Sequence, residues 1–174
     1  INHPIVNDKK YGLFSLNKYI ARELSISRLA LHASTISFKD LNNNSANGQK
    51  VAEHLSNHPM VERVAYPGTS SGLPKERADK YLSNGCGGLL GFEIKGGHEA
   101  GKKFINSLEM LYHVANIGDS RSLAIHPAST THSQLNEEEL ASGGISSGYI
   151  RLSIGLEHID DILADIDQAL AKAE

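Results

Sequence analysis

The last part of the chain places a strand with one apolar face directly before a helix with one apolar stripe. Residues 149–156 alternate apolar Ile150, Leu152 and Ile154 with polar Arg151 and Ser153, and a period of two is typical of a half-buried strand. In residues 159–170, the apolar side chains recur at the spacing of a helix that buries one face. Because each element must cover its apolar face, this pair predicts a helix packed on a sheet.

From residue 46 onward, helix and strand signals alternate with short connections. Helices are predicted over residues 47–55, 74–82, 99–108 and 159–170, with a further helix after the capping pair Asn136 and Glu139. Strands are predicted over residues 61–66, 87–95, 111–116 and 149–156. The predicted fold class is therefore α/β, or α+β in two layers, with a small sheet of about four strands covered by helices.

Length and composition indicate one soluble domain. The 174 residues match the usual size of a single domain, and a net charge of −3 without long runs of like charge argues against nucleic acid as a partner. No apolar run is long enough to predict a membrane span or a signal peptide, so we expect a cytoplasmic protein. The single cysteine, Cys86, excludes an internal disulfide. Because the chain begins with Ile1, we expect it to be part of a longer protein.

Residues 1–45 are interpreted as a separate helical segment. Leu13, Leu16, Ile20 and Leu24 fit a helical stripe, which predicts a long helix over residues 11–38. The polar run at residues 42–45 (NNNS) predicts a turn or kink, because short polar side chains compete for backbone hydrogen bonds.

Three motif look-alikes are rejected on physical grounds. Residues 144–148 spell G-x-S-x-G, but a nucleophile elbow needs a strand before the serine and a helix after it, and here the predicted order is reversed. The glycines at residues 85–88 lead into a strand rather than a helix, so no helix N-terminus faces a phosphate. His54 and His58 lie four residues apart without a third ligand nearby, which favours a solvated surface pair over a metal site.

Two polar segments remain as candidate functional regions. In residues 149–157, strand alternation puts Arg151 on the face opposite the apolar side chains. Spacing alone leaves two interpretations of Arg151 with equal weight: its side chain is solvated, or it is a receptor for a carboxylate. A planar guanidinium can hold a carboxylate with two parallel hydrogen bonds. The other segment, residues 116–133, is longer than a connection needs. Such loops often carry function, although a packed loop that satisfies its own backbone is the alternative.

Five phrases carry a family resemblance. They lie at residues 50–59, 115–119, 122–135, 150–157 and 159–162, and read KVAEHLSNHP, ANIGD, SLAIHPASTTHSQL, IRLSIGLE and IDDI. Together, residues 46–174 resemble the C-terminal domain of the pyridoxal-phosphate enzymes of cysteine and methionine metabolism, and within them most the O-acetylhomoserine sulfhydrylases. Residues 1–45 match poorly at the place where that family has a long interdomain helix.

The resemblance implies roles for three residues. By matching position, Arg151 corresponds to the arginine that binds the α-carboxylate of the substrate, and Asn116 lies next to the same carboxylate. Thr131 corresponds to the threonine that steadies that arginine. In such enzymes, anchoring the carboxylate sets which bond to Cα stands perpendicular to the cofactor plane. These three are the expected substrate-binding residues.

The lysine that would bind the cofactor is missing from the sequence. The family's Schiff-base lysine stands in a Ser-x-Thr-Lys phrase, and the closest match here, residues 33–36, reads ASTI with Ile36 in place of the lysine. The cofactor cradle belongs to the family's larger N-terminal domain. We therefore expect no catalytic, cofactor-binding or metal-binding residue in this chain, and an inactive fragment when the chain is alone.

The resemblance implies a function for the whole enzyme. With pyridoxal phosphate, a sulfhydrylase converts O-acetylhomoserine and sulfide to homocysteine and acetate, as part of methionine biosynthesis. The implied partners are the amino-acid substrate, the N-terminal domain and further copies in a homotetramer. The alternatives are cystathionine γ-synthase, cystathionine β-lyase, methionine γ-lyase, or a stand-alone amino-acid-binding or interaction module.

Overall fold

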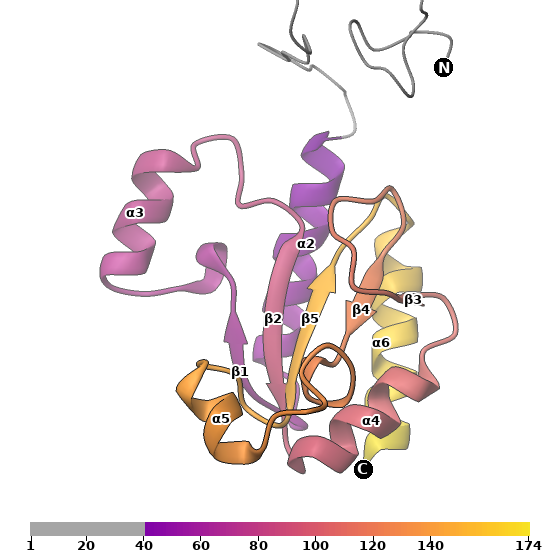
Figure 1. The fold of residues 1–174 in the computed structure, drawn as a ribbon. Helices are drawn as coiled ribbons and strands as arrows, with labels where there is room; N and C mark the ends of the chain where they lie inside the picture. Colours follow the sequence, from indigo (N-terminus) through magenta and orange to yellow (C-terminus); the bar gives the residue numbers. More distant parts are fainter. Residues whose placement is uncertain (1–40) are drawn as a thin grey trace, which may run out of the picture. The chain divides into compact units, whose positions relative to one another are not determined.

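The computed structural model describes residues 41–174, which are built around a five-stranded sheet (Figure 1). The strands are β1 (Val61–Ala65), β2 (Leu89–Ile94), β3 (Tyr112–His113), β4 (Leu123–Ile125) and β5 (Tyr149–Ser153). The α-helices are α2 (Leu41–Ser56), α3 (Leu73–Tyr81), α4 (Gly97–Ser107), α5 (Glu137–Ser142) and α6 (Ile159–Ala173). Two short 3₁₀ helices, η1 (Pro67–Thr69) and η2 (Pro127–Ser129), complete the set. The predicted fold class, helices covering a small sheet, is confirmed.

The strand order is β1-β2-β5-β4-β3, so β5 is the central strand. It pairs antiparallel with β2 on one side and with β4 on the other, whereas β3 and β4 are parallel. In this register Arg151 lies between Gly91 of β2 and Ile125 of β4. The most C-terminal predicted strand thus forms the middle of the sheet.

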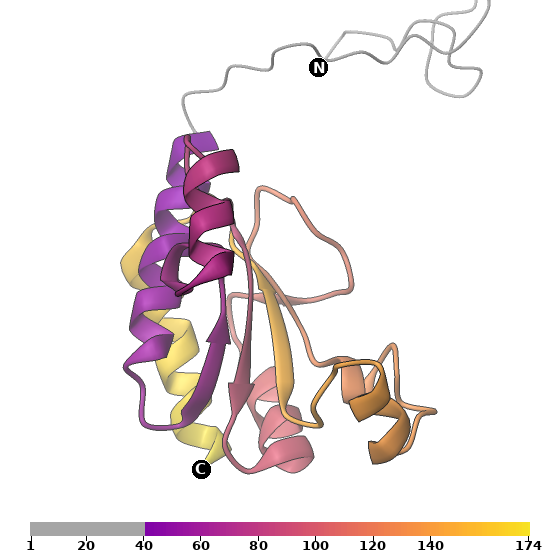
Figure 2. The same cartoon turned by 90° about the vertical axis from the view of Figure 1, so that its left-hand side faces the viewer.

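The core lies between one face of the sheet and the helices. Figure 2 shows α2 and α6 on one side of the sheet, with α5 and the loop between β3 and β4 on the other. Ile150, Leu152 and Ile154 are fully buried, as are Ile162 and Ile166 of α6. The predicted alternation of β5 and the predicted apolar stripe of the last helix are therefore confirmed.

The turn predicted at residues 42–45 is wrong, because α2 begins at Leu41 and runs through this segment. Asn44 and Ser45, with Asn47 one turn further on, make tertiary contacts instead. The Asn44 amide donates to the carbonyl of Ile154, Ser45 Oγ accepts from the Gly87 N–H at 3.1 Å, and Asn47 Nδ2 donates to the carbonyl of Glu157 at 3.0 Å. The long helix predicted over residues 11–38 lies outside the described residues.

The sequence prediction missed β4. Residues 123–125 form only three residues of strand, inside a segment that the sequence analysis treated as loop. Other predictions at this level hold: Asn136 and Glu139 form the predicted capping box at the start of α5. Residues 144–148 follow a helix and precede a strand, which is the wrong order for a nucleophile elbow.

A buried carboxylate on α6 fixes the segment that leads into β3. Asp165, which is 6% exposed, accepts hydrogen bonds from three successive backbone N–H groups, at distances of 2.8, 3.0 and 2.9 Å. The donors are those of Glu109, Met110 and Leu111. A buried charge is tolerated only when it is hydrogen-bonded in this way.

We expect Asp165→Ala to lower the free energy of unfolding by about 2–4 kcal/mol, because it leaves three backbone donors without their acceptor. Urea denaturation of the chain measures the change. Asp167→Ala on the same helix is the control. It removes a partly exposed ion pair with His54, so its cost should stay below about 1 kcal/mol. Equal losses in the two variants would contradict this account of Asp165.

Candidate functional site

Arg151 lies on the face of β5 that the helices α2, α4 and α6 leave uncovered. Its neighbours in sequence, Ile150 and Leu152, are fully buried in the core, whereas Arg151 is partly exposed. Because it stands in the central strand of the sheet, the backbone of Arg151 is held by ladders on both sides. A guanidinium on such a rigid element loses little entropy on binding a ligand.

The structure brings Arg151 and Asn116 together. The guanidinium Nη2 donates to the main-chain carbonyl oxygen of Asn116 at 3.2 Å. Asn116 was expected next to the substrate carboxylate, and its contact with Arg151 in the structure is made by its backbone. This leaves the Asn116 amide side chain, which is exposed, outside that hydrogen bond.

Thr131 is not brought to Arg151 among the described residues. Its exposed hydroxyl lies 2.8 Å from Nδ1 of the adjacent His132, just beyond η2. The proposed role of Thr131 in steadying Arg151 has no corresponding contact in this structure.

The loop at residues 116–122 crosses the open face beside β5. Gly118 N–H donates to Ser153 Oγ at 3.0 Å. Further along, the Glu157 carboxylate accepts from both the backbone N–H and the hydroxyl of Ser122, at 2.6 and 2.8 Å. Sequence reasoning missed Ser153 and Glu157 as parts of this region. The available signal for Ser153 was its position two residues after Arg151, on the same face of the strand.

His126 connects η2, α4 and the segment before β5. It is fully buried, with Nδ1 2.8 Å from Ser129 Oγ and Nε2 2.8 Å from the carbonyl of Ser147. A side chain at Gly101 on α4 would overlap its ring, so this glycine makes room for the imidazole. Burial lowers the pKa of His126 below 6.5, although the hydrogen bond to the Ser147 carbonyl acts in the opposite direction, and the nearby His98, His113 and Lys102 add to the lowering.

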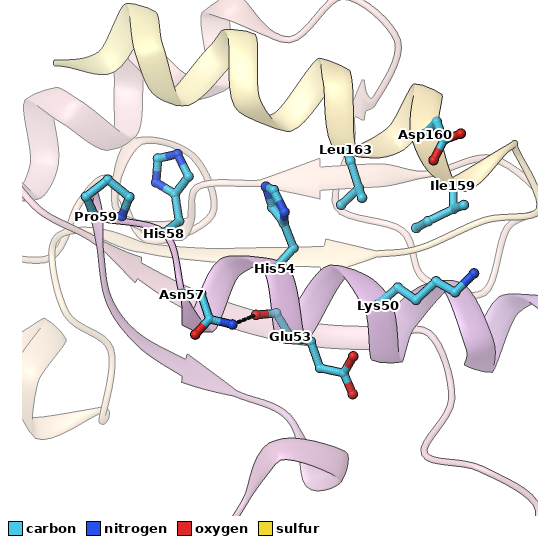
Figure 3. A pocket seen from close by; sticks show the side chains of 9 residues that line it. All are labelled: Lys50, Glu53, His54, Asn57, His58, Pro59, Ile159, Asp160 and Leu163. Atoms are coloured by element: carbon cyan, nitrogen blue, oxygen red, sulfur yellow. Dashed lines mark hydrogen bonds between the residues drawn. The ribbon is translucent and has the colours of Figure 1, made fainter.

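A groove between α2 and α6 lies on the other side of the sheet from Arg151. Figure 3 shows Lys50 and His54 on α2 with Ile159 and Leu163 on α6. His54 Nε2 lies 2.6 Å from Asp167 Oδ1, so this histidine contacts the neighbouring helix, and its ring centroid lies 6.2 Å from that of His58. Within residues 41–174, no three His, Cys, Asp or Glu side chains gather as metal ligands, and no helix is long and apolar enough to span a membrane.

The described residues do not fit the covalent attachment of pyridoxal phosphate. The lysines with a defined side-chain contact lie on helices and turns and contact neighbouring groups there: Lys75 contacts Asp79, Lys80 the Tyr81 ring, Lys95 the carbonyl of Pro59, Lys102 Glu99 and Lys172 Glu109. None of these contacts involves Arg151 or the loop at residues 116–122.

Comparison with known proteins decides the family. The family model described as Cys/Met metabolism PLP-dependent enzyme matches residues 34–171. The chain belongs to this family. It is 55% identical over 127 residues to the O-acetyl-L-homoserine sulfhydrylase of Leptospira meyeri, and 48% identical over 125 residues to the L-methionine gamma-lyase of Pseudomonas putida.

A solved structure supports the same fold. The crystal structure described as an O-acetylhomoserine (thiol)-lyase from Campylobacter jejuni, which carries a pyridoxyl-lysine, matches with a TM-score of 0.69 and 45% identity. The match covers 76% of this chain and 31% of that one. The matches to the L. meyeri and P. putida enzymes each cover 72% of this chain. They cover 29% of the L. meyeri enzyme and 31% of the P. putida enzyme. The chain thus spans less than a third of the length of these relatives.

We expect the burial of His126 to make stability depend on pH. Because its pKa is lowered in the fold, neutral His126 contributes stability that is complete above about pH 6.5 and is lost as the pH falls below that value. His126→Gln should therefore lose less unfolding free energy between about pH 7 and pH 5 than the unsubstituted chain. Urea denaturation at a series of pH values measures this.

His132→Gln is the matched control, because His132 lies outside the core and should keep the original pH dependence. A His126→Gln profile parallel to that of the unsubstituted chain would show that His126 does not contribute.

Proposed function

We propose that the chain is the substrate-carboxylate-binding, C-terminal domain of a pyridoxal-phosphate-dependent O-acetylhomoserine sulfhydrylase. The single observation that carries the proposal is Arg151, a partly exposed guanidinium on the central strand with a hydrogen bond to the Asn116 carbonyl. The 55% identity to the L. meyeri sulfhydrylase supports the choice within the family.

The proposed reaction replaces one group on the γ-carbon of the amino acid. The sulfur of sulfide forms a bond to Cγ, the bond from Cγ to the acetyl ester oxygen breaks, and acetate leaves while homocysteine remains. Pyridoxal phosphate, held by the rest of the enzyme, supplies the electron sink for this chemistry. The replacement moves an acetylated homoserine into methionine biosynthesis.

The role of this chain in that reaction is to bind and orient. Arg151 would hold the α-carboxylate with its remaining N–H donors, since one already bonds to the Asn116 carbonyl. Asn116 and Thr131 remain proposed substrate-binding residues. A fixed carboxylate restricts rotation of the substrate about Cα, which is how binding energy selects the bond that breaks.

A γ-elimination enzyme is the second candidate. The 48% identity to the P. putida methionine gamma-lyase favours it nearly as much, and a carboxylate receptor serves either reaction. Full-length enzyme supplied with O-acetylhomoserine and sulfide should form homocysteine and acetate. Rapid release of methanethiol and 2-oxobutanoate from methionine, with little homocysteine formed, would favour the lyase instead.

The rest of the enzyme is the proposed partner of the open sheet face. Leu89 and Ile117 are 47% and 54% exposed on or above this face, an apolar surface that an N-terminal domain would cover.

We also propose a homotetramer and an inactive isolated chain, as the family resemblance implies. Calorimetry of the isolated chain with O-acetylhomoserine tests the alternative of a stand-alone binding module, because tight binding without cofactor would favour the module.

We expect Arg151→Lys to lower kcat/KM for O-acetylhomoserine by about 10- to 100-fold in the full-length enzyme. A lysine keeps the charge but cannot hold a carboxylate with two parallel hydrogen bonds, and a hydrogen bond to a charged group contributes about 1.5–3 kcal/mol. Steady-state kinetics measures the loss, which should raise KM and lower kcat together.

Arg63→Lys is the matched control. Arg63 lies on β1 of the same sheet, pairs with Glu93 at 2.7 Å and is mostly exposed, so its replacement should leave the kinetics within about twofold. If Arg151→Lys behaves like Arg63→Lys, Arg151 is not the carboxylate receptor.

A further inference from the structure

Every second residue of the loop at residues 116–122 is hydrogen-bonded to the segment at residues 151–157. In order along the loop, the contacts join Asn116 to Arg151, Gly118 to Ser153, Ser120 to Leu156 and Ser122 to Glu157. The order is the same in both segments, so the loop runs alongside residues 151–157. A shift of the loop at one contact would therefore disturb its neighbours.

Ser153 makes the contact next to Arg151. The two side chains stand two residues apart on the same face of β5, and Ser153 is only 5% exposed. Its Oγ accepts from Gly118 N–H at 3.0 Å, so the buried hydroxyl has a partner. Gly118 has a φ of +73°, a left-handed conformation that favours glycine, and this turn lies two residues after the Asn116 carbonyl.

Glu157 holds the other end of the loop. Its two carboxylate oxygens accept from Ser122 N–H and Ser122 Oγ, at 2.6 and 2.8 Å. The Ser122 hydroxyl also accepts from Gly155 N–H at 2.9 Å, and the carbonyl of Glu157 accepts from Asn47 of α2 at 3.0 Å. Glu157 and Ser122 are therefore hydrogen-bonded both to the segment that follows β5 and to the helix α2.

We propose that Ser153 is a positioning residue for Arg151, with Glu157 as the second anchor of the same loop. Ser153 holds the turn at Gly118, the turn fixes the Asn116 carbonyl, and that carbonyl holds the Arg151 guanidinium. The inference rests on the proposed carboxylate site, and it adds to that site two side chains that do not touch the substrate.

The chain of contacts predicts an effect on substrate binding rather than on the chemical step. Among the described residues, the side chain of Arg151 has one hydrogen-bond partner, the Asn116 carbonyl, so freeing that carbonyl lets the guanidinium leave the position that binds the carboxylate. The apparent dissociation constant rises in inverse proportion to the fraction of time spent in that position. If Arg151 is in place for about a tenth to a third of the time, binding weakens about 3- to 10-fold.

The first test replaces Ser153 in the full-length holoenzyme. We expect Ser153→Ala to raise KM for O-acetylhomoserine about 3- to 10-fold with kcat changed less than about twofold. Ser153→Thr keeps the hydroxyl acceptor and should restore KM to within about twofold. Ser146→Ala is the control, because Ser146 Oγ is buried without a hydrogen-bond partner among the described residues. An unchanged KM in Ser153→Ala would overturn the proposal.

The second test asks whether Ser153 acts through Arg151. In an Arg151→Lys background, Ser153→Ala should add less than about a twofold change in KM, since the group that it positions is already gone. If the KM change in the double variant equals the product of the two single-variant changes, Ser153 does not act through Arg151. That result would overturn the positioning role and leave Arg151 as the receptor. An unchanged KM in Arg151→Lys alone would instead overturn the proposed carboxylate site.

A third measurement needs no substitution at Ser153. In hydrogen exchange of the 174-residue chain, the amides of Gly118 and Ser122 should be protected, and Glu157→Gln should speed exchange at Ser122 at least about tenfold more than at the β2 amides. Unprotected Gly118 and Ser122 amides in the unsubstituted chain would overturn the proposal even if every Ser153 variant failed to fold.

Discussion

The two faces of β5 are the constraint on which the rest of the structure depends. One face carries Ile150 and Leu152, and Ile154 follows directly after the strand; all three are fully buried against the helix layer. The other carries Arg151 and Ser153, which bond to the loop at residues 116–122. Because the apolar face cannot turn toward water without exposing three large side chains, the polar face is held in place by the hydrophobic effect. The rigidity of the proposed site therefore comes from the core behind it.

How far the sequence predicts this fold depends on the distance over which each element is stabilised. The alternation of β5, the stripe of α6 and the capping box of α5 are local patterns, and all three were predicted correctly. The start of α2 was not, because Asn44 bonds to the carbonyl of Ile154, a residue 110 positions away. The three-residue strand β4 was missed for the same reason, since it is defined by pairing with β5 and not by its own pattern.

In the candidate site, too, local patterns were predicted and long-range contacts were missed. Strand periodicity put Arg151 on the correct face, but it left open whether the side chain was solvated or functional. The family resemblance directed attention to Asn116 and Thr131 by residue type, whereas the contact to Arg151 uses the Asn116 carbonyl and Thr131 bonds to His132. A backbone contact depends on the path of the loop, and no side-chain motif encodes that path. Ser153 and Glu157 belong to the site only through the path of the loop, which no local sequence pattern predicts.

The proposed site would bind a carboxylate strongly only when another part of the enzyme excludes water from it. Two unit charges 4 Å apart interact by about 1 kcal/mol in water and by about 4 kcal/mol at the effective dielectric near a protein surface. Arg151 lies partly exposed, so its charge alone holds a carboxylate weakly. In the proposed site, the described residues would supply orientation, through the contact of Arg151 with Asn116 and the contact of Gly118 with Ser153, and a covering domain would supply the exclusion of water. Under the proposed function, affinity for the substrate therefore arises at the boundary between this chain and the rest of the enzyme, and the contribution of this side is a guanidinium held in position before the substrate arrives.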